Sequence, residues 1–520
     1  MKTIVIGLDG ANWDLLGPWL KDGELPNLAL LREEGSWGVS LAQLPAVTCP
    51  NWRCYSTGKN PGKLGVYWWK MLDKKARRLR GFDAKTFKSA DYFDYLAERM
   101  RVGVLNFPTS YPPKRTCGFW IAGPPDAAET GYAEPPEMEV RLREEFGYRV
   151  HPRIPLQTQE DDNKEAIAGI LDLIGTRFRV AEALLDEVDF LQLSIYYSNN
   201  LQHFLFDHPA TLAAWRIIDR YLGIFRARPD LRIVLMSDHG IGKVSATFHI
   251  NRWLEEEGLL SLIPGAHWSR RLAAVKPFGF NPRGLLKDFF EARGLKERLR
   301  HTLPRALSSL LFLSESPLSP IPLEIVDWEK SRAIGLGQGV VYILRDKDDE
   351  EYYRVRSRVK EGLTSLKNPV SGQPVARGVY AREEVYRGPY LDFAPDLVFE
   401  QAHDLYTVAS YNPTAFSLPT RWRAENVREG IFLAAGEGIH PGPCPGPINI
   451  IDLAPTIMHW LGMEIPEDMD GRVVGELFEA GSEPAARTVR KREPIRVDPA
   501  VASPSEQAEL TQRLESLGYL

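Results

Sequence analysis

The sequence predicts an α/β protein: a mostly parallel sheet covered by helices on both faces, with an inserted helical cap. Short apolar segments, typical of fully buried strands, alternate along the chain with amphipathic helical segments. The 520 residues are 44% hydrophobic and 26% charged, which is ordinary for a globular protein with a large core. A net charge of −5, without a long single-sign block, argues against a protein that coats a nucleic-acid polymer.

The first expected elements are a buried strand, a short helix and a second strand, at Thr3–Leu8, Asn27–Glu34 and Trp37–Leu44. The next helix begins near Pro50, because a proline in the first turn of a helix loses no hydrogen bond. This places Thr48 or Cys49 at the N-cap.

Predicted strands and helices alternate most clearly in the middle of the chain. Apolar residues recur at three- and four-residue spacing from Ile167 to Leu185, which predicts an amphipathic helix over Lys164–Glu187. The neighbouring segments are expected as helix Asp91–Met100, strand Val102–Phe107, strand Phe190–Ile195, helix Ala210–Phe225 and strand Arg232–Met236. Parallel sheets of this kind bind ligands at the carboxyl ends of their strands.

Changes in composition suggest the domain boundaries. Residues 1–258 and 323–478 are expected to form the α/β core, to which strand Ala333–Leu344, helix Glu351–Leu366 and strand Leu397–Glu400 return the chain. Residues 259–322, with arginine-rich helical stretches and several prolines, are expected to form the cap. Residues 479–520 are expected to be a loosely held tail that ends in helix Gln507–Ser516.

The cysteine content and the N-terminus bear on the compartment. The four cysteines cannot form a disulfide framework and include no CxxC pair. The apolar stretch before Asp9 is too short for a signal peptide, and no run of about 18 apolar residues occurs. We therefore expect a protein without a membrane span, in a reducing compartment, most simply the cytoplasm.

Candidate site residues come directly after the expected strands: Asp9, Asn199, Asp238 and His239. Because the carboxyl ends of parallel strands share one edge of the sheet, we expect these side chains to form one site. Carboxylate oxygens beside an imidazole nitrogen are typical ligands of a divalent metal. The alternative is structural, with Asp9 in an Asx turn and Asp238-His239-Gly240 in a capped turn.

Thr48 is a further candidate. A hydroxyl at a helix N-terminus lies among unpaired backbone N–H groups, whose positive field favours an alkoxide and a bound phosphate. The alternative is that Thr48 only caps the helix.

These residues resemble the alkaline phosphatase superfamily, in its type I phosphodiesterase/nucleotide pyrophosphatase branch. The similar segments are spread over nearly the whole chain: Ile4–Gly10, Thr48–Trp52, Thr57–Gly62, Leu105–Pro113, Gln202-His203, Ser237–Gly240, Asn251–Leu254, Ala394–Leu397, Asp452–Thr456 and Asp470–Arg472. The resemblance implies two metal ions, about 4 Å apart, on either side of a phosphoryl group.

The resemblance also assigns ligands to both ions. The first would be held by Asp9, Asp238, His239 and the nucleophile Thr48, all of which are present. The second would be held by an aspartate, a histidine four residues later and a distant histidine; this chain has Asn199, His203 and Asn426 there.

The two asparagines change the second site. Their neutral carbonyl oxygens can bind Ca²⁺ or Mg²⁺ but give no charge to hold Zn²⁺. Alternatively, the site is lost and Asn199 caps a turn, or His208 or His440 replaces a missing ligand.

The resemblance implies a metal-dependent hydrolase of phosphate esters, either a phosphodiesterase or a phosphatase, that forms a phosphothreonine intermediate at Thr48. It implies one or two divalent ions (Zn, Mn or Mg) and a small-molecule phosphate ester as substrate. Arg53, in the same helix as Thr48, either contacts the phosphoryl oxygens or lies at the surface.

Two other functions remain open. One is a non-catalytic binding protein that keeps the fold and one metal. The other is a sulfatase, which needs Cys-x-Pro-x-Arg; here Cys49 is followed directly by Pro50, and Thr48 takes the nucleophile position.

Overall fold

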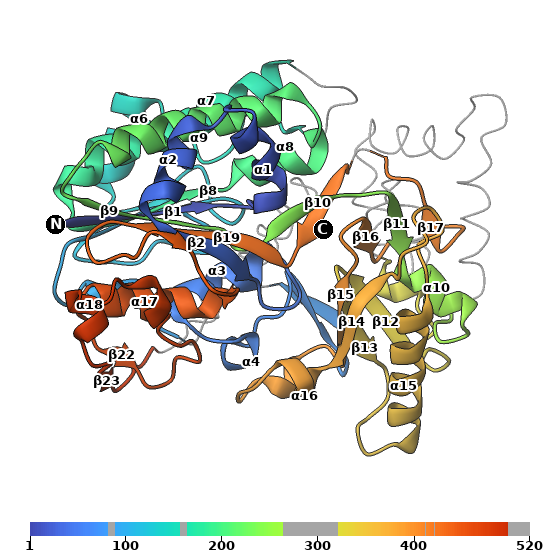
Figure 1. Cartoon of the computed structure of the whole chain (residues 1–520). Helices are drawn as coiled ribbons and strands as arrows, with labels where there is room; N and C mark the ends of the chain where they lie inside the picture. The colour runs from blue at the N-terminus through green and yellow to red at the C-terminus, as the bar shows by residue number, and fades with distance from the viewer. Residues whose placement is uncertain (82–88, 157–163, 264–320, 411, 421, 498–520) are drawn as a thin grey trace.

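The computed structural model describes residues 1–81, 89–156, 164–263, 321–410, 412–420 and 422–497, which form two lobes (Figure 1). The larger lobe holds a ten-stranded sheet in the order β20-β2-β19-β9-β1-β8-β5-β6-β7, with β21 beside β2. Helices cover both faces of this sheet, so the predicted α/β fold with a mostly parallel, helix-covered sheet is confirmed.

The centre of the large sheet is parallel. Its strands are β1 (Lys2–Leu8), β2 (Ser36–Leu41), β5 (Val102–Phe107), β6 (Gly118–Ala122), β7 (Ala133–Glu134), β8 (Phe190–Ile195), β9 (Leu231–Met236), β19 (Glu429–Ala435), β20 (Gly442–Pro443) and β21 (Ile448–Asn449). Strand β1 pairs in parallel with β8 and β9, and β5 pairs in parallel with β6 and β8. Every residue of β5 and β8 is buried, as coverage on both faces requires. Strand β19 runs antiparallel to β2 and β9.

Two helical layers enclose this sheet (Figure 1). One layer contains α1 (Trp13–Lys21), α2 (Pro26–Glu34), α6 (Glu137–Phe146), α7 (Lys164–Leu184), α8 (Tyr197–Leu205) and α9 (Pro209–Arg226). The other contains α3 (Thr48–Thr57), α4 (Pro61–Leu64), α17 (Leu453–Trp460) and α18 (Glu483–Ala486). Helix α5 (Tyr92–Leu96) packs against α3 and α17. The predicted helix over Lys164–Glu187 is present as α7 followed by a 3₁₀ turn at Leu185–Glu187.

The smaller lobe has a four-stranded sheet of its own, in the order β12-β13-β15-β14. Its strands are β12 (Ala333–Gly337), β13 (Val340–Ile343), β14 (Ala376–Ala381) and β15 (Leu397–Gln401), packed against α10 (Ile250–Glu256) and α15 (Glu350–Ser365). These elements, expected to return the chain to the α/β core, thus form a sheet separate from the large one. An apolar strand pattern reports burial on both faces, but it does not identify the sheet that the strand joins.

Short elements complete the smaller lobe and the edges of the larger one. They are β3 (Lys70–Asp73), β4 (Arg78–Gly81), β10 (Gly240–Lys243), β11 (Ala246–His249), β16 (Leu405–Val408), β17 (Phe416–Ser417), β18 (Ala424–Val427), β22 (Ile465–Pro466), β23 (Lys491–Arg492), α16 (Arg382–Val385) and 3₁₀ turns at Leu323–Ile325, Leu391–Phe393, Ile450–Asp452 and Gly475–Leu477. Strands β10 and β18 pair antiparallel.

Most of the expected cap, residues 264–320, lies outside the described residues, as does the expected final helix. At the edges of the cap, Leu262 pairs with Val326, and the Ile263 N–H group donates to the Ile325 carbonyl at 3.0 Å. The chain thus leaves and re-enters the smaller lobe at neighbouring points, and the inserted cap stays a prediction.

The described part of the tail, residues 479–497, is packed against the larger lobe, so the expectation that it is loosely held is wrong there. Strand β23 pairs with β22, and the Ile495 N–H group donates to the Tyr95 hydroxyl at 3.0 Å. Among the described helices, none combines the length and the apolar content that crossing a membrane requires.

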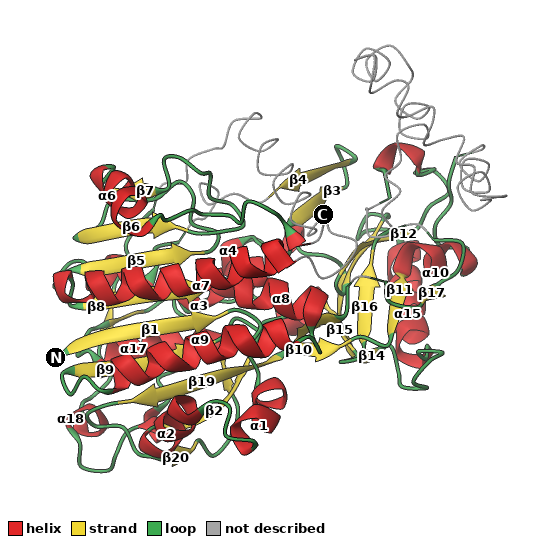
Figure 2. Ribbon diagram, turned by 90° about the horizontal axis from the view of Figure 1, so that it is seen from above, coloured by secondary structure: helices red, strands yellow, loops and turns green. Residues whose placement is uncertain are grey.

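The turn after β1 approaches α8 closely. Gly10 has φ +72°, and a Cβ atom there would lie 2.3 Å from Asn199 Oδ1. Because the turn has no side chain at this position, the end of β1 can lie against the first turn of α8. Figure 2 shows that β1 and β5 point toward the smaller lobe, so the carboxyl edge of the sheet faces that lobe.

We expect Gly10→Ala to lower the free energy of unfolding more than Gly23→Ala does. Both glycines have left-handed φ angles, +72° and +75°, so alanine at either costs roughly 1–2 kcal/mol. Only the methyl group at position 10 also collides with Asn199, whereas position 23 has no heavy atom within 4 Å. Urea unfolding followed by circular dichroism makes the comparison, and equal losses would contradict the close approach.

Candidate metal centre

The structure brings Asp9, Asp238, His239 and Thr48 together at the carboxyl edge of the large sheet. Asp9 follows β1, Asp238 and His239 follow the neighbouring β9, and Thr48 is the first residue of α3. All four side chains are buried. One ligand atom from each of Asp9, Asp238 and His239 lies within 4.8 Å of the other two. We call these four residues the charged donor group.

The distances within the charged donor group fit a bound cation. His239 Nε2 lies 3.1 Å from Thr48 Oγ1, 3.1 Å from Asp238 Oδ2 and 3.7 Å from Asp9 Oδ1. Metal–ligand bonds of about 2.0–2.1 Å in tetrahedral geometry separate the ligand atoms by roughly 3.3–3.4 Å. The three donor atoms nearest His239 Nε2 therefore lie from it at separations close to those between ligands of a tetrahedral ion.

The tautomer of His239 supports the same conclusion. Its Nδ1 lies 2.9 Å from the Gly240 carbonyl, so this nitrogen carries the proton and donates. Nε2 is then an acceptor, which faces the Thr48 hydroxyl, able to donate to it, and the carboxylate oxygens of Asp238 and Asp9. A backbone carbonyl that holds the second ring nitrogen is the usual arrangement for a metal-ligating histidine.

The two carboxylates lack compensating charge. Asp9 Oδ1 and Asp238 Oδ2 are buried and have no hydrogen-bond partner. Burial raises the pKa of Asp9 to about 8, against the lowering effect of a hydrogen bond from Trp52. Burial and then the nearby Asp9 carboxylate raise the pKa of Asp238 well above its usual value. Two adjacent buried carboxylates are stable as anions only beside a cation, so the donors present fit a divalent metal.

Trp52 is a site residue to which the sequence interpretation gave no role. Its indole N–H group donates to Asp9 Oδ2 at 3.1 Å and leaves Oδ1 directed at the other donors. Trp52 follows Thr48 by four residues, so both lie on one face of α3. That spacing was visible in the sequence, but the partner of the indole depends on how α3 packs against β1.

A second group of donors comes from α8 and β18. Asn199 and His203 are one helical turn apart on α8, and Asn426 lies on β18, opposite Ile241 of β10. Asn199 Oδ1, His203 Nε2 and Asn426 Oδ1 are all buried without a hydrogen-bond partner. We call Asn199, His203 and Asn426 the neutral donor group.

His203 is held as a neutral imidazole. Its Nδ1 lies 2.7 Å from the Ala424 carbonyl and donates to it, which leaves Nε2 as an acceptor. Burial lowers the pKa of His203 to about 3. The neutral donor group thus offers two amide oxygens and one imidazole nitrogen, and no charge.

The structure decides the alternatives for the start of α3. Val47 occupies the N-cap position, with no side-chain hydrogen bond, so the prediction of a Thr48 or Cys49 cap is wrong. Cys49 packs in the apolar cluster that contains Val47 and Tyr67, and burial raises the pKa of its thiol. Of these two residues, Thr48 is the one whose side chain contacts His239.

Arg53 is not a surface residue. Its guanidinium is buried and forms an ion pair with Asp91 at 3.0 Å. That alternative is therefore wrong, while contact of Arg53 with a phosphoryl oxygen stays a prediction.

The two histidines considered as replacement ligands lie elsewhere. The His208 side chain accepts from the Ala210 N–H group and caps α9, and His440 is exposed. Neither belongs to the metal-ligand cluster of the described residues.

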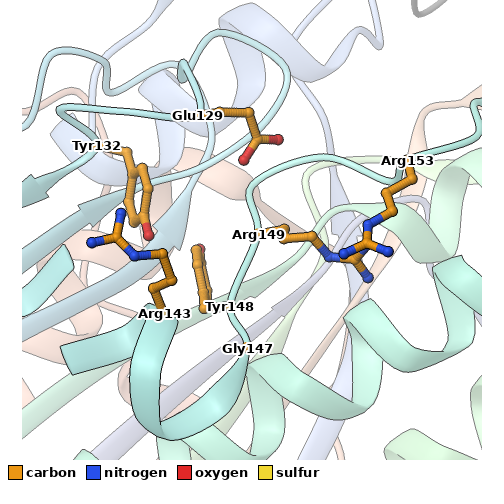
Figure 3. Close-up of a pocket in the computed structure, with 7 residues that line it drawn as sticks. All are labelled: Glu129, Tyr132, Arg143, Gly147, Tyr148, Arg149 and Arg153. Atoms are coloured by element: carbon orange, nitrogen blue, oxygen red, sulfur yellow. The ribbon is translucent and has the colours of Figure 1, made fainter. Parts of the chain in front are cut away.

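A cavity of about 470 Å³ lies apart from both donor groups (Figure 3). Its lining residues are Glu129, Tyr132, Arg143, Gly147, Tyr148, Arg149 and Arg153. None of the predicted site residues lines it.

Comparisons with known proteins agree with this fold. Phosphonoacetate hydrolase from Sinorhizobium meliloti 1021, in complex with phosphonoformate, is 16% identical with a TM-score of 0.54, over 87% of this chain and 94% of that chain. A mutant of the alkaline phosphatase PafA is 13% identical with a TM-score of 0.51, over 92% and 98%. At these identities the likeness shows a shared fold. No curated protein gives a significant match. The family model for type I phosphodiesterase / nucleotide pyrophosphatase matches residues 3–429, and the chain therefore belongs to that family.

Proposed function

We propose that this protein is a metal-dependent hydrolase of phosphate esters in which Thr48 attacks the phosphorus atom. The observation that supports this most directly is the Thr48 hydroxyl, 3.1 Å from His239 Nε2 beside two buried carboxylates. Membership of the type I phosphodiesterase / nucleotide pyrophosphatase family supports a phosphate-ester hydrolase.

The residues of the charged donor group would have separate tasks. A divalent cation held by Asp9, Asp238 and His239 would lower the pKa of the Thr48 hydroxyl and polarise a phosphoryl oxygen. Trp52 and the Gly240 carbonyl fix the orientation of Asp9 and His239. The position of Thr48 at the N-terminus of α3 adds a positive field that favours its alkoxide.

The reaction would proceed in two displacements. Thr48 Oγ1 forms a bond to phosphorus while the bond from phosphorus to the leaving oxygen breaks, and that oxygen takes up a proton. Water then attacks the phosphothreonine, releases phosphate or a phosphomonoester and restores the hydroxyl. The substrate class is a small-molecule phosphodiester or phosphomonoester, and the cofactor is one or two divalent ions.

We expect Thr48→Ala to lower hydrolysis of bis(p-nitrophenyl) phosphate and p-nitrophenyl phosphate on the order of 10³-fold or more, because the nucleophile is removed. Thr48→Ser keeps a hydroxyl and should retain measurable turnover. Elemental analysis should show the same metal content in all three proteins, since Asp9, Asp238 and His239 remain. Undiminished turnover in Thr48→Ala would disprove the nucleophile. A wild-type protein with bound metal and no turnover on either ester would instead support the non-catalytic alternative.

Removal of metal is expected to make stability fall as pH rises. In the metal-free folded protein the Asp9 carboxyl keeps its proton up to about pH 8, whereas its ordinary pKa is 3.8. The stabilisation that the protonated Asp9 carboxyl contributes to the free energy of unfolding is therefore full below pH 3.8 and is lost as pH rises through about 8. The stabilisation that added Mn²⁺ or Zn²⁺ provides should grow over the same range.

Thermal unfolding between pH 5 and 9, with chelator and with metal, measures this effect. Asp9→Asn should reduce the dependence, because the amide does not titrate, while burial still raises the pKa of Asp238. A metal-free midpoint that rises from pH 5 to pH 8 would contradict the assignment of the buried carboxylates.

A further inference from the structure

Glu425, on β18, is a buried carboxylate that accepts hydrogen bonds only from neutral groups. Its Oε1 accepts from Gln338 Nε2 and from the Asn426 N–H group, both at 2.9 Å. Its Oε2 accepts from Trp422 Nε1 at 2.6 Å. Both oxygens are thus solvated by dipoles, but none of these donors carries a positive charge.

This separates Glu425 from comparably buried acids. Within the described residues, five acidic side chains are at most 1% exposed: Asp9, Asp91, Asp238, Asp396 and Glu425. Asp91 pairs with Arg53 and Lys114, and Asp396 pairs with Arg382 and Lys74. Asp9 and Asp238 belong to the charged donor group. Only Glu425 has neither an ion pair nor a metal-ligand partner in the described part of the chain, and an isolated buried charge is costly.

Three consecutive residues of β18 tie Glu425 to the neutral donor group. Ala424 accepts the Nδ1–H group of His203, Asn426 is itself a member, and Glu425 lies between them. The Trp422 indole, held by Glu425, also packs on His203, with ring centroids 4.0 Å apart and an interplanar angle of 30°.

The surroundings are apolar on this side. Trp422 stacks on Tyr406 as well, with centroids 5.1 Å apart, and both belong to a buried cluster with Val244 and Val408. In such a medium a negative charge acts on a nearby cation more strongly than it would in water.

We propose that a divalent cation binds the neutral donor group and that Glu425 supplies its counter-charge from behind the ligands. The inference rests on the proposed metal-dependent function of the same site. Two amide oxygens and one imidazole nitrogen suit a hard or borderline ion such as Mg²⁺, Ca²⁺ or Mn²⁺. Glu425 is then a positioning residue: it fixes Trp422 and Asn426 and balances the charge without touching the ion.

Direct titration with Mn²⁺, followed by electron paramagnetic resonance, tests the proposal. The wild-type chain should bind two equivalents. Glu425→Gln keeps the shape and removes the charge, so it should keep one equivalent and bind the second at least tenfold more weakly. Glu400→Gln is the matched control, because Glu400 is largely buried but paired with Arg377 and Arg428, and it should still bind two.

A rescue experiment separates charge from packing. Asn199→Asp in the Glu425→Gln background places a carboxylate within the neutral donor group and should restore the second equivalent, whereas a purely structural role of Glu425 would not be rescued. Gln338→Lys tests the charge without altering Glu425. An ammonium group beside Oε1 would neutralise the Glu425 carboxylate and weaken the binding of the second ion.

The outcomes are distinct from those for the proposed function. One equivalent in the wild-type chain, unchanged second-ion affinity in both Glu425→Gln and Gln338→Lys, or failure of Asn199→Asp to rescue would each overturn the role of Glu425. Two bound ions together with no hydrolysis of any ester would remove the proposed function and leave this inference standing.

Discussion

The arrangement of this protein depends on negative charge that is buried at the carboxyl edge of a parallel sheet. Asp9 and Asp238 follow neighbouring strands, so the sheet forces their carboxylates together in a place that water does not reach. Without a cation, one or both must hold a proton, as the raised pKa values indicate. The surrounding helices then act as supports: α3 brings Thr48 and Trp52 to the carboxylates, and α8 approaches the turn at Gly10.

The two donor groups differ in charge. The charged donor group has two carboxylates and an imidazole, which is enough to hold a dication. The neutral donor group has only amide oxygens and an imidazole, so its charge must come from elsewhere. In our proposal this charge comes from Glu425, which lies on β18 beside the candidate ligand Asn426 and accepts its N–H group.

The junction between the lobes explains why these groups meet. Strand β10 begins directly after His239, which follows β9, and pairs with β18, the strand that carries Asn426. Gln338 lies in the turn between β12 and β13, and its side-chain amide donates to Glu425. This hydrogen bond connects the smaller sheet to β18. A residue of the smaller lobe can therefore influence ligand positions on α8 through Trp422 and His203.

The sequence by itself determined the parallel sheet and the family resemblance and predicted the candidate donors, because buried strands and the residues that follow them leave local patterns. It placed Asp9, Asp238 and His239 just past strand ends, where the structure has them, whereas Asn199 lies in the first turn of α8 after β8. Only the tertiary structure decided that Ala333–Ile343 belongs to a separate sheet, that Arg53 is buried against Asp91, and that Trp52 and Glu425 support the donors. These features depend on contacts between residues far apart in the chain, and local periodicity carries no information about such contacts.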